Sequence, residues 1–160
     1  MKLARFDLYR YGLPFSGPLT LGGITLFQRE GILLRLSGDD GSEGWGETAP
    51  LPGFSVESQG EAASQLHRLA GSMIGREVRE DWVDPYGEFG GELDRVAPSV
   101  RFGFELAVWN LYAASSGRTL PEVVTPFPRA VLPVNGLLAG SPADVLVKAR
   151  RMRDEGYRSI

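Results

Sequence analysis

The side chains of this 160-residue chain that could carry out bond-making chemistry form no recognisable catalytic set. The sequence contains no cysteine, which excludes disulfides, thiol nucleophiles and cysteine-based zinc sites. Its 20 acidic residues show no spacing that would bring several carboxylates to one metal ion, and its only lysines are Lys2 and Lys148. The single histidine, His67, lies beside the apolar stripe of an expected helix, which favours a solvated or edge-packed side chain. We therefore predict neither catalytic nor metal-binding residues in this chain.

The segment best suited to binding is a loop that follows an alternating strand. Residues 44–47 read Gly-Trp-Gly-Glu, and residues 49–55 continue as Ala-Pro-Leu-Pro-Gly-Phe-Ser. The two prolines fix φ and lack an N–H donor, so the strand should end there. The glycine allows a sharp turn that would project Phe54. We interpret this loop as a cover for a site, the alternative being an ordinary strand and turn.

Three antiparallel strands are expected to open the chain and to carry this loop. Alternation and β-favouring residues predict strands over residues 2–13, 24–36 and 44–48. Pro14 should end the first strand, because the Gly-rich connection after it is too irregular for either period. An Asp-Asp-Gly turn at 39–41 should join the second strand to the third.

An amphipathic helix should follow the loop. Apolar residues recur at helical spacing over residues 62–73, and Gly75 is available as the C-terminal stop. Ser58 and Glu61 match the capping-box pattern at its start. Ser55 is an alternative cap for the same helix.

A second helix is predicted over residues 99–114, which are apolar nearly all round, as expected of a helix buried on most faces. Gly117 should end it. Its polar positions, Glu105 and Asn110, are better explained by structural hydrogen bonds than by chemistry. The preceding residues 76–97 are polar and should form a loop with one short helical piece.

A change of architecture is expected near residue 128. Three prolines between residues 121 and 128 mark an interdomain connection, so we predict one domain over residues 1–128 and another over 129–160. Residues 130–136 read as a short buried strand. Because this unit cannot close a parallel sheet by itself, it should be only the beginning of a larger layer.

The predicted strand should lead into a helix. Ser141 supplies an N-cap, Pro142 the first helical position and Asp144 an acid in the first turn. Gly156 should stop this helix, and residues 157–160 look like the start of a further strand. Val145, Leu146, Ala149 and Met152 should share its apolar face.

Composition limits the class of protein. A hydrophobic content of 42% can bury one ordinary core, and no apolar run is long enough to span a bilayer. The N-terminus lacks the pattern of a secretory signal, so we expect a cytoplasmic protein. The net charge is −3, and Arg150, Arg151 and Arg153, near an expected helix C-terminus, read as a solvated face. We expect neither a nucleic acid nor a membrane as a partner.

The sequence of residues 44–47 and 49–55 closely resembles that of the N-terminal capping domain of the o-succinylbenzoate synthases, a family of the enolase superfamily. The resemblance implies an α+β capping domain, with a three-stranded antiparallel sheet and helices, followed by the start of a (β/α) barrel. It further implies that two loops, residues 16–23 and 50–55, close over the substrate. Residues 131–135 would correspond to the first barrel strand.

The resemblance also implies a set of substrate-binding residues. Phe54 would be an apolar wall, Leu19 a lid residue, and Thr20 and Ser55 polar loop contacts. Asn135 would be a pocket donor or acceptor at the end of the first barrel strand. Ser55 could equally be a helix cap. Asn135 could equally make a structural hydrogen bond at the strand end.

The catalytic groups of the family lie elsewhere. In it the barrel supplies a lysine base from a Lys-x-Lys motif, a second lysine and three carboxylates that bind Mg²⁺, and all of these would fall after Ile160. We therefore expect this chain to be part of a longer protein and to be inactive alone. That protein would dehydrate a small carboxylate, succinyl-hydroxycyclohexadiene carboxylate, to o-succinylbenzoate in menaquinone synthesis, through an enediolate stabilised by Mg²⁺.

Two alternatives remain open. The same chemistry would serve an N-acylamino-acid racemase or a dipeptide epimerase of the same superfamily. A different class would be a complete, non-catalytic α+β binding module of 160 residues. Against the module stands the apolar surface of the last βα unit, which would be left without a partner layer.

Overall fold

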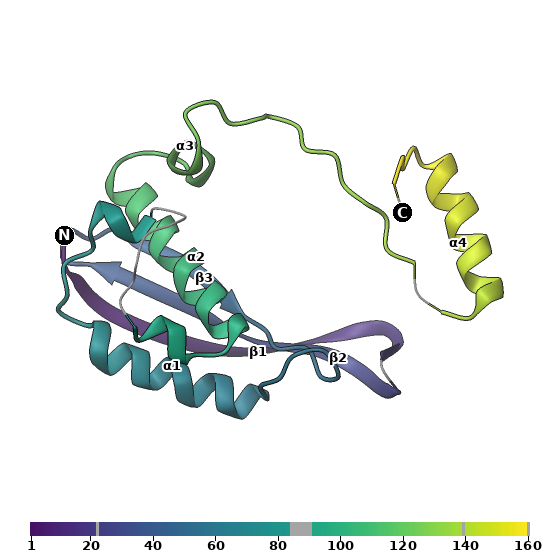
Figure 1. Cartoon of the computed structure of the whole chain (residues 1–160), viewed down its shortest axis with the longest axis horizontal. Helices are drawn as coiled ribbons and strands as arrows, with labels where there is room; N and C mark the ends of the chain where they lie inside the picture. Colours follow the sequence, from purple (N-terminus) through teal and green to yellow (C-terminus); the bar gives the residue numbers. More distant parts are fainter. Residues whose placement is uncertain (22, 84–90, 139, 160) are drawn as a thin grey trace. The chain divides into compact units, whose positions relative to one another are not determined.

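The computed structural model describes residues 1–21, 23–83, 91–138 and 140–159. The chain forms two compact units, Met1–Pro128 and Arg129–Ile160, and each is described by itself. The first unit contains a sheet and its covering helices, and the described part of the second contains one helix (Figure 1). No helix in the described ranges combines the length and the apolar character needed to cross a membrane.

The first unit is built on a three-stranded antiparallel sheet in the order β1, β2, β3. Its strands are β1 (Leu3–Leu21), β2 (Ile24–Gly38) and β3 (Glu43–Thr48). The predicted turn at 39–41 is present between β2 and β3, where Gly41 takes a φ of 85° that only glycine adopts freely. The second and third predicted strands are therefore confirmed.

The first strand is longer than predicted. Pro14 does not end β1; it pairs with Gln28, and the strand continues to Leu21, which pairs with Ile24. A proline is tolerated here because β1 is an edge strand whose outward side needs no N–H donor. The register shifts between Pro14 and Leu19, so the irregular sequence produces an irregular hairpin arm instead of a separate connection.

Helix α1 (Gln59–Met73) begins and ends where the sequence indicates. The Ser58 hydroxyl accepts from the Glu61 amide at 3.2 Å, and the Glu61 carboxylate accepts from the Ser58 amide at 2.8 Å, which completes the capping box. Ser55 is not the cap. Gly75 follows the helix with a φ of 86°. The buried side of α1 joins the core through Ala62, Ala63, Leu66, Leu69 and Met73.

Helix α2 (Pro98–Ser115) packs on the same face of the sheet as α1 (Figure 1). Phe104 at its centre is fully buried and stacks on Phe6 of β1, with 5.9 Å between ring centroids. The helix is buried or half-buried along most of its length, as expected, and Phe102 is an exception at 62% exposed. Trp109 and Tyr112, outside the fully buried stripe, are half-buried and also pack against the core.

The contact between α2 and β3 is unusually close. A Cβ atom at Gly44 would lie 2.6 Å from Leu111 Cβ, and one at Gly46 would lie 2.9 Å from the Ala107 nitrogen. A Cβ at Gly103, on the helix, would lie 2.6 Å from the Glu47 carbonyl oxygen. The glycines of the Gly-Trp-Gly-Glu segment therefore let helix and strand backbones meet.

The polar residues of α2 have the structural roles that the sequence indicates. Asn110 donates to the Trp45 carbonyl at 2.9 Å and to the Leu106 carbonyl at 3.0 Å. Glu105 pairs with Arg101 one turn earlier at 2.7 Å. Gly117 ends the helical region with a φ of 66°.

Short helical turns occupy the connections. The described part of residues 76–97, a range predicted to hold one helical piece, contains two 3₁₀ turns, η1 (Glu80–Val83) and η2 (Leu93–Arg95). Residues 84–90, part of the predicted loop, lie outside the described residues. The proline-rich connection holds a further short helix, α3 (Leu120–Val124).

The second unit contains α4 (Pro142–Asp154), with the predicted Ser141 and Asp144 capping box and a φ of 95° at Gly156. The strand predicted over residues 130–136 is not formed, and Val131 is 82% exposed. Residues 157–159 also form no strand, and Ile160 lies outside the described residues. A parallel strand needs a neighbouring strand to accept its ladder bonds, and none runs beside these described residues.

Candidate functional site

The loop after β3 is a closed turn. We call residues 49–55 the Pro-Gly loop. The amides of Phe54 and Ser55 donate to the Leu51 carbonyl at 3.0 and 2.8 Å, and the Leu51 amide donates to the Ser55 hydroxyl at 2.9 Å. Gly53 takes a φ of 85°, as the predicted sharp turn requires. Phe54 projects from this turn and is 67% exposed.

Ser55 therefore holds the loop itself together. Its hydroxyl accepts from a backbone amide four residues earlier, whereas Ser58 caps α1. The helix-cap interpretation of Ser55 is wrong. Its contact with a substrate stays a prediction.

The tip of the Pro-Gly loop lies against the end of the β1–β2 hairpin. The Cβ position at Gly53 is 3.4 Å from Ile24 Cδ1 and 3.5 Å from the Leu21 carbonyl oxygen. The two segments named as substrate-covering loops are thus neighbours. In this hairpin Leu19 pairs with Leu26 and is half-buried, and Thr20 is exposed with its hydroxyl 3.2 Å from that of Thr25.

Asn135 belongs to the second compact unit, where its side chain is exposed. The predicted residues of the first unit, Leu19, Thr20, Phe54 and Ser55, lie on two adjoining segments. Four of the five predicted residues thus lie on neighbouring segments, and Asn135 lies in the other unit.

Two residues at the base of the loop were not identified from the sequence. The Arg29 guanidinium, on β2, donates to the Pro50 carbonyl at 3.0 Å and also to the Ala49 carbonyl. On the outer face of the sheet, the Tyr11 hydroxyl donates to Glu47. Burial and this hydrogen bond raise the pKa of Tyr11 to about 12. Neither contact has a local sequence signal, because both depend on the register of the sheet.

A groove of about 350 Å³ opens between β2, the Pro-Gly loop and the start of α1. Its walls combine apolar and polar groups, as small-molecule sites do. Leu26 and Pro52 contribute apolar surface, and Arg29 and Ser55 contribute polar surface.

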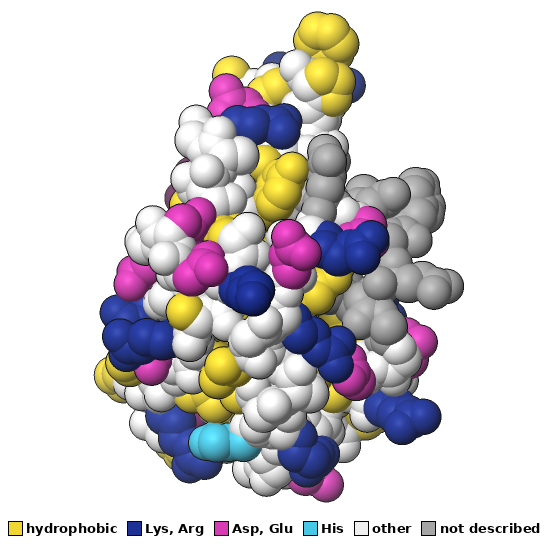
Figure 2. Space-filling model, turned by 90° about the vertical axis from the view of Figure 1, so that its left-hand side faces the viewer, with side chains coloured by type: hydrophobic (Ala, Val, Ile, Leu, Met, Phe, Trp, Pro, Cys, Tyr) yellow, Lys and Arg dark blue, Asp and Glu magenta, His cyan; other side chains and the backbone are white. Residues whose placement is uncertain are grey.

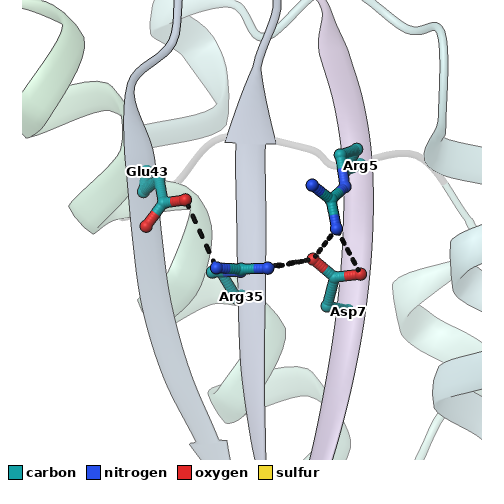
Figure 3. A network of polar contacts seen from close by, with 4 residues as sticks. All are labelled: Arg5, Asp7, Arg35 and Glu43. Atoms are coloured by element: carbon teal, nitrogen blue, oxygen red, sulfur yellow. Dashed lines mark hydrogen bonds and ion pairs between the residues drawn. The ribbon is translucent and has the colours of Figure 1, made fainter.

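A polar network on the outer face of the sheet holds β3 in line with the other strands (Figure 3). Arg35 bridges Asp7 at 2.9 Å and Glu43 at 3.5 Å, and Arg5 also pairs with Asp7 at 3.1 Å. The hydrogen bond from Arg35 lowers the pKa of Asp7 below its ordinary value. Within the sheet, Arg35 of this network lies opposite Trp45, the third residue of β3.

The aromatic groups on this face complete the arrangement. Trp45 stacks on Tyr9 with 5.8 Å between centroids, and the Arg35 guanidinium lies 5.7 Å from the Trp45 ring. The Gly-Trp-Gly-Glu segment therefore has two sides: its glycines face α2, and Trp45 and Glu47 face outward. The stacked side chains of Tyr9, Trp45 and Arg35 hold β3, the strand that leads into the Pro-Gly loop.

The described part of the chain contains no group of three or more His, Asp or Glu side chains placed to hold a metal ion. His67 is exposed, and its Nδ1 lies 2.7 Å from the Ala63 carbonyl oxygen of its own helix. Acidic and basic side chains are interspersed on the face shown in Figure 2.

Comparison with known proteins supplies the family. The model of the MenC N-terminal domain matches residues 3–111. The o-succinylbenzoate synthase of Aliivibrio salmonicida is 33% identical over 160 residues, which cover 100% of this chain and 41% of that protein. The enzyme of the same name from Citrobacter koseri is 32% identical over 154 residues, covering 96% of this chain and 40% of that protein. The chain thus spans about two fifths of the length of these relatives.

Solved structures agree on the fold. A member of the enolase superfamily from Roseovarius nubinhibens matches with a TM-score of 0.73 at 20% identity, covering 98% of this chain and 43% of that one. A dipeptide epimerase from Methylococcus capsulatus, complexed with Mg and a dipeptide, matches with a TM-score of 0.76 at 22% identity, covering 99% and 44%. The sheet with its helices therefore has the α+β fold of these enolase-superfamily structures, and the chain belongs to the MenC N-terminal domain family.

Proposed function

We propose that this chain is the capping segment of an o-succinylbenzoate synthase, a carbon–oxygen lyase that dehydrates succinyl-hydroxycyclohexadiene carboxylate to o-succinylbenzoate. The observation that carries the proposal is the likeness to a synthase along all 160 residues. Because the chain spans 41% of that relative, the activity belongs to a longer protein.

In this proposal the two adjoining segments of the first unit form the substrate lid. Phe54 projects from a turn closed by three hydrogen bonds, so its ring can serve as a fixed apolar wall. Leu19 would add apolar surface from the hairpin, and Thr20 and Ser55 would supply hydroxyl groups. Closing such a lid removes water from the reacting groups and so strengthens the electrostatic interactions within the site.

The second unit, residues 129–160, is assigned in this proposal to the first βα unit of a barrel. Asn135 would then lie at the end of the first barrel strand and offer an amide to the substrate. Residues 130–136 would become a strand once neighbouring barrel strands are present, and their exposed apolar side chains support this.

Mg²⁺ is the expected cofactor of the longer protein, where it would stabilise the enediolate formed on removal of the α-proton. The described residues of this chain do not fit a Mg²⁺ site, because they hold no cluster of carboxylates or histidines. We therefore assign the metal ligands and the lysine base to the part of the protein outside this chain. The role of this chain is to bind, cover and orient the substrate.

A second candidate function is epimerisation of a dipeptide or racemisation of an N-acylated amino acid. The fold of the Methylococcus capsulatus dipeptide epimerase favours it, since that structure covers 99% of this chain. Its 22% identity shows the fold only, whereas the synthases share 32–33% identity over nearly all of the chain. We therefore prefer the synthase.

Steady-state kinetics of the full-length protein with both substrate classes test the proposal. We expect a larger kcat/KM for the cyclohexadiene carboxylate than for an N-acylamino acid or a dipeptide. The Phe54→Ala variant should raise KM for the preferred substrate, because it removes an apolar wall. A preference for the N-acylamino acid or dipeptide would refute the synthase assignment.

A further inference from the structure

The base of the Pro-Gly loop is joined to β2 by hydrogen bonds from the Arg29 side chain, where the backbone ladder has ended. The β2–β3 ladder ends where Ile32 pairs with Thr48. It cannot continue through Pro50, because proline has no N–H to donate. Beyond this point Arg29 supplies the missing donors, with one bond of 3.0 Å to the Pro50 carbonyl and another to the Ala49 carbonyl.

Arginine is suited to this position. Its planar guanidinium presents several N–H donors in a fixed fork, so one side chain can satisfy two neighbouring carbonyls. Arg29 is half-buried, and its guanidinium reaches both oxygens from β2. The guanidinium thus determines the direction in which the chain leaves the sheet.

A second contact supports the same end of β3. The Tyr11 side chain crosses the central strand at Gly31, where a Cβ atom would lie 2.5 Å from Tyr11 Cε1. This close approach lets the Tyr11 hydroxyl donate to Glu47, two residues before the loop. Tyr11 therefore holds the C-terminal end of β3, and Arg29 holds the first residues of the loop.

We infer that Arg29 is a positioning residue that makes the Pro-Gly loop and the β1–β2 hairpin act as one lid. Arg29 lies on the hairpin strand β2 and binds the base of the loop, and the loop tip at Gly53 lies beside Ile24 and Leu21 of the same hairpin. Two attachments hold the loop to the hairpin, so Phe54 keeps its place relative to Leu19. The inference rests on the proposed function only in that these segments cover the substrate.

Hydrogen–deuterium exchange on the full-length protein tests the attachment independently of activity. In Arg29→Ala the amides of Leu51, Phe54 and Ser55 should exchange roughly tenfold faster, because their hydrogen bonds open with the loop. Arg29→Lys, which retains a charged donor group but not the planar fork, should be intermediate. Arg68→Ala, at an exposed position on α1, is the matched control and should match the wild type.

Kinetics on the same variants test the consequence. Arg29→Ala should raise KM roughly tenfold with kcat within a factor of about two, as expected when a group binds ground state and transition state alike. Arg29→Lys should recover part of the affinity. If the wild type prefers a dipeptide or N-acylamino acid, the synthase assignment fails, and the same KM comparison on that substrate tests Arg29.

Three results would overturn the inference. Unchanged exchange in the Pro-Gly loop would show that Arg29 does not hold it. Faster exchange throughout α2 and β3 would show a general loss of stability instead. A loosened loop with an unaltered KM would show that loop position does not matter for binding. If the wild type is inactive with every substrate, the hydrogen–deuterium exchange comparison alone tests whether Arg29 holds the loop.

Discussion

Substituting Gly46 by alanine should disrupt the contact between α2 and β3. The added Cβ would lie 2.9 Å from the Ala107 nitrogen and 3.0 Å from Ala107 Cβ, and closer still to the Gly103 carbonyl oxygen. These are mainly backbone atoms, which cannot move aside as a flexible side chain can. The helix must shift away from the strand, with loss of packing around Phe104 and Ala107.

The magnitude follows from what such overpacking costs. Inserting a methyl group into a well-packed core typically costs about 1–3 kcal/mol, and a clash with backbone should lie at the upper end. A loss of about 3 kcal/mol would lower the melting temperature of a domain of this size by roughly 10 °C. Gly103→Ala should behave similarly. The double variant should lose less stability than the sum of the two single losses, because one shift of the helix relieves both clashes.

Thermal unfolding of the full-length protein, followed by circular dichroism, measures this effect. Gly71→Ala is the matched control, because a Cβ at this exposed position of α1 meets nothing within 4 Å. Alanine there should be neutral or stabilising by up to about 1 kcal/mol. A Gly46→Ala variant that melts together with the wild type would refute the close-approach explanation of the Gly-Trp-Gly-Glu segment.

Two further predictions concern Tyr11 and Ser58. Folding raises the pKa of Tyr11 from 10.0 to about 12, so its contribution to stability is complete below pH 10 and is lost as the pH rises through 12. Urea unfolding between these pH values should therefore show a steeper loss of unfolding free energy in the wild type than in Tyr11→Phe, and equal slopes would contradict this. Ser58→Ala should cost about 1 kcal/mol by removing the α1 cap, measured by thermal unfolding against Ser64→Ala, and a difference of zero would count against the capping box.

Local signals predicted the ends of elements well. The Ser58 capping box and the Ser141 capping box are confirmed, and the glycines after α1 and α4 take positive φ. These features depend on a few residues close in sequence, whose hydrogen bonds form within one turn. The turn at 39–41 is predictable for the same reason.

Features that depend on a neighbour elsewhere in the fold were not predictable in the same way. Pro14 is compatible with a strand only because β1 lies at the edge of the sheet, and edge position is a tertiary property. Residues 130–136 have the composition of a buried strand but form none in this chain, because no described strand is available to pair with them.

In the candidate site, too, features with a local sequence signal were predictable and features that depend on the tertiary fold were not. The loop with Phe54 could be recognised from its prolines and glycine, and its closed turn is present. The Arg29 contact could not, because it joins residues about 20 positions apart through the register of β2 and β3. The bond of Ser55 to Leu51 was missed because a serine near a helix start more often signals a cap.

The central claim is that the first unit is the lid of an o-succinylbenzoate synthase. A crystal structure of the full-length protein with o-succinylbenzoate bound tests it most directly. We predict that the Phe54 ring and the Leu19 side chain lie in van der Waals contact with the product, at about 4 Å. Product bound with no atom of residues 16–23 or 50–55 in contact would contradict the account.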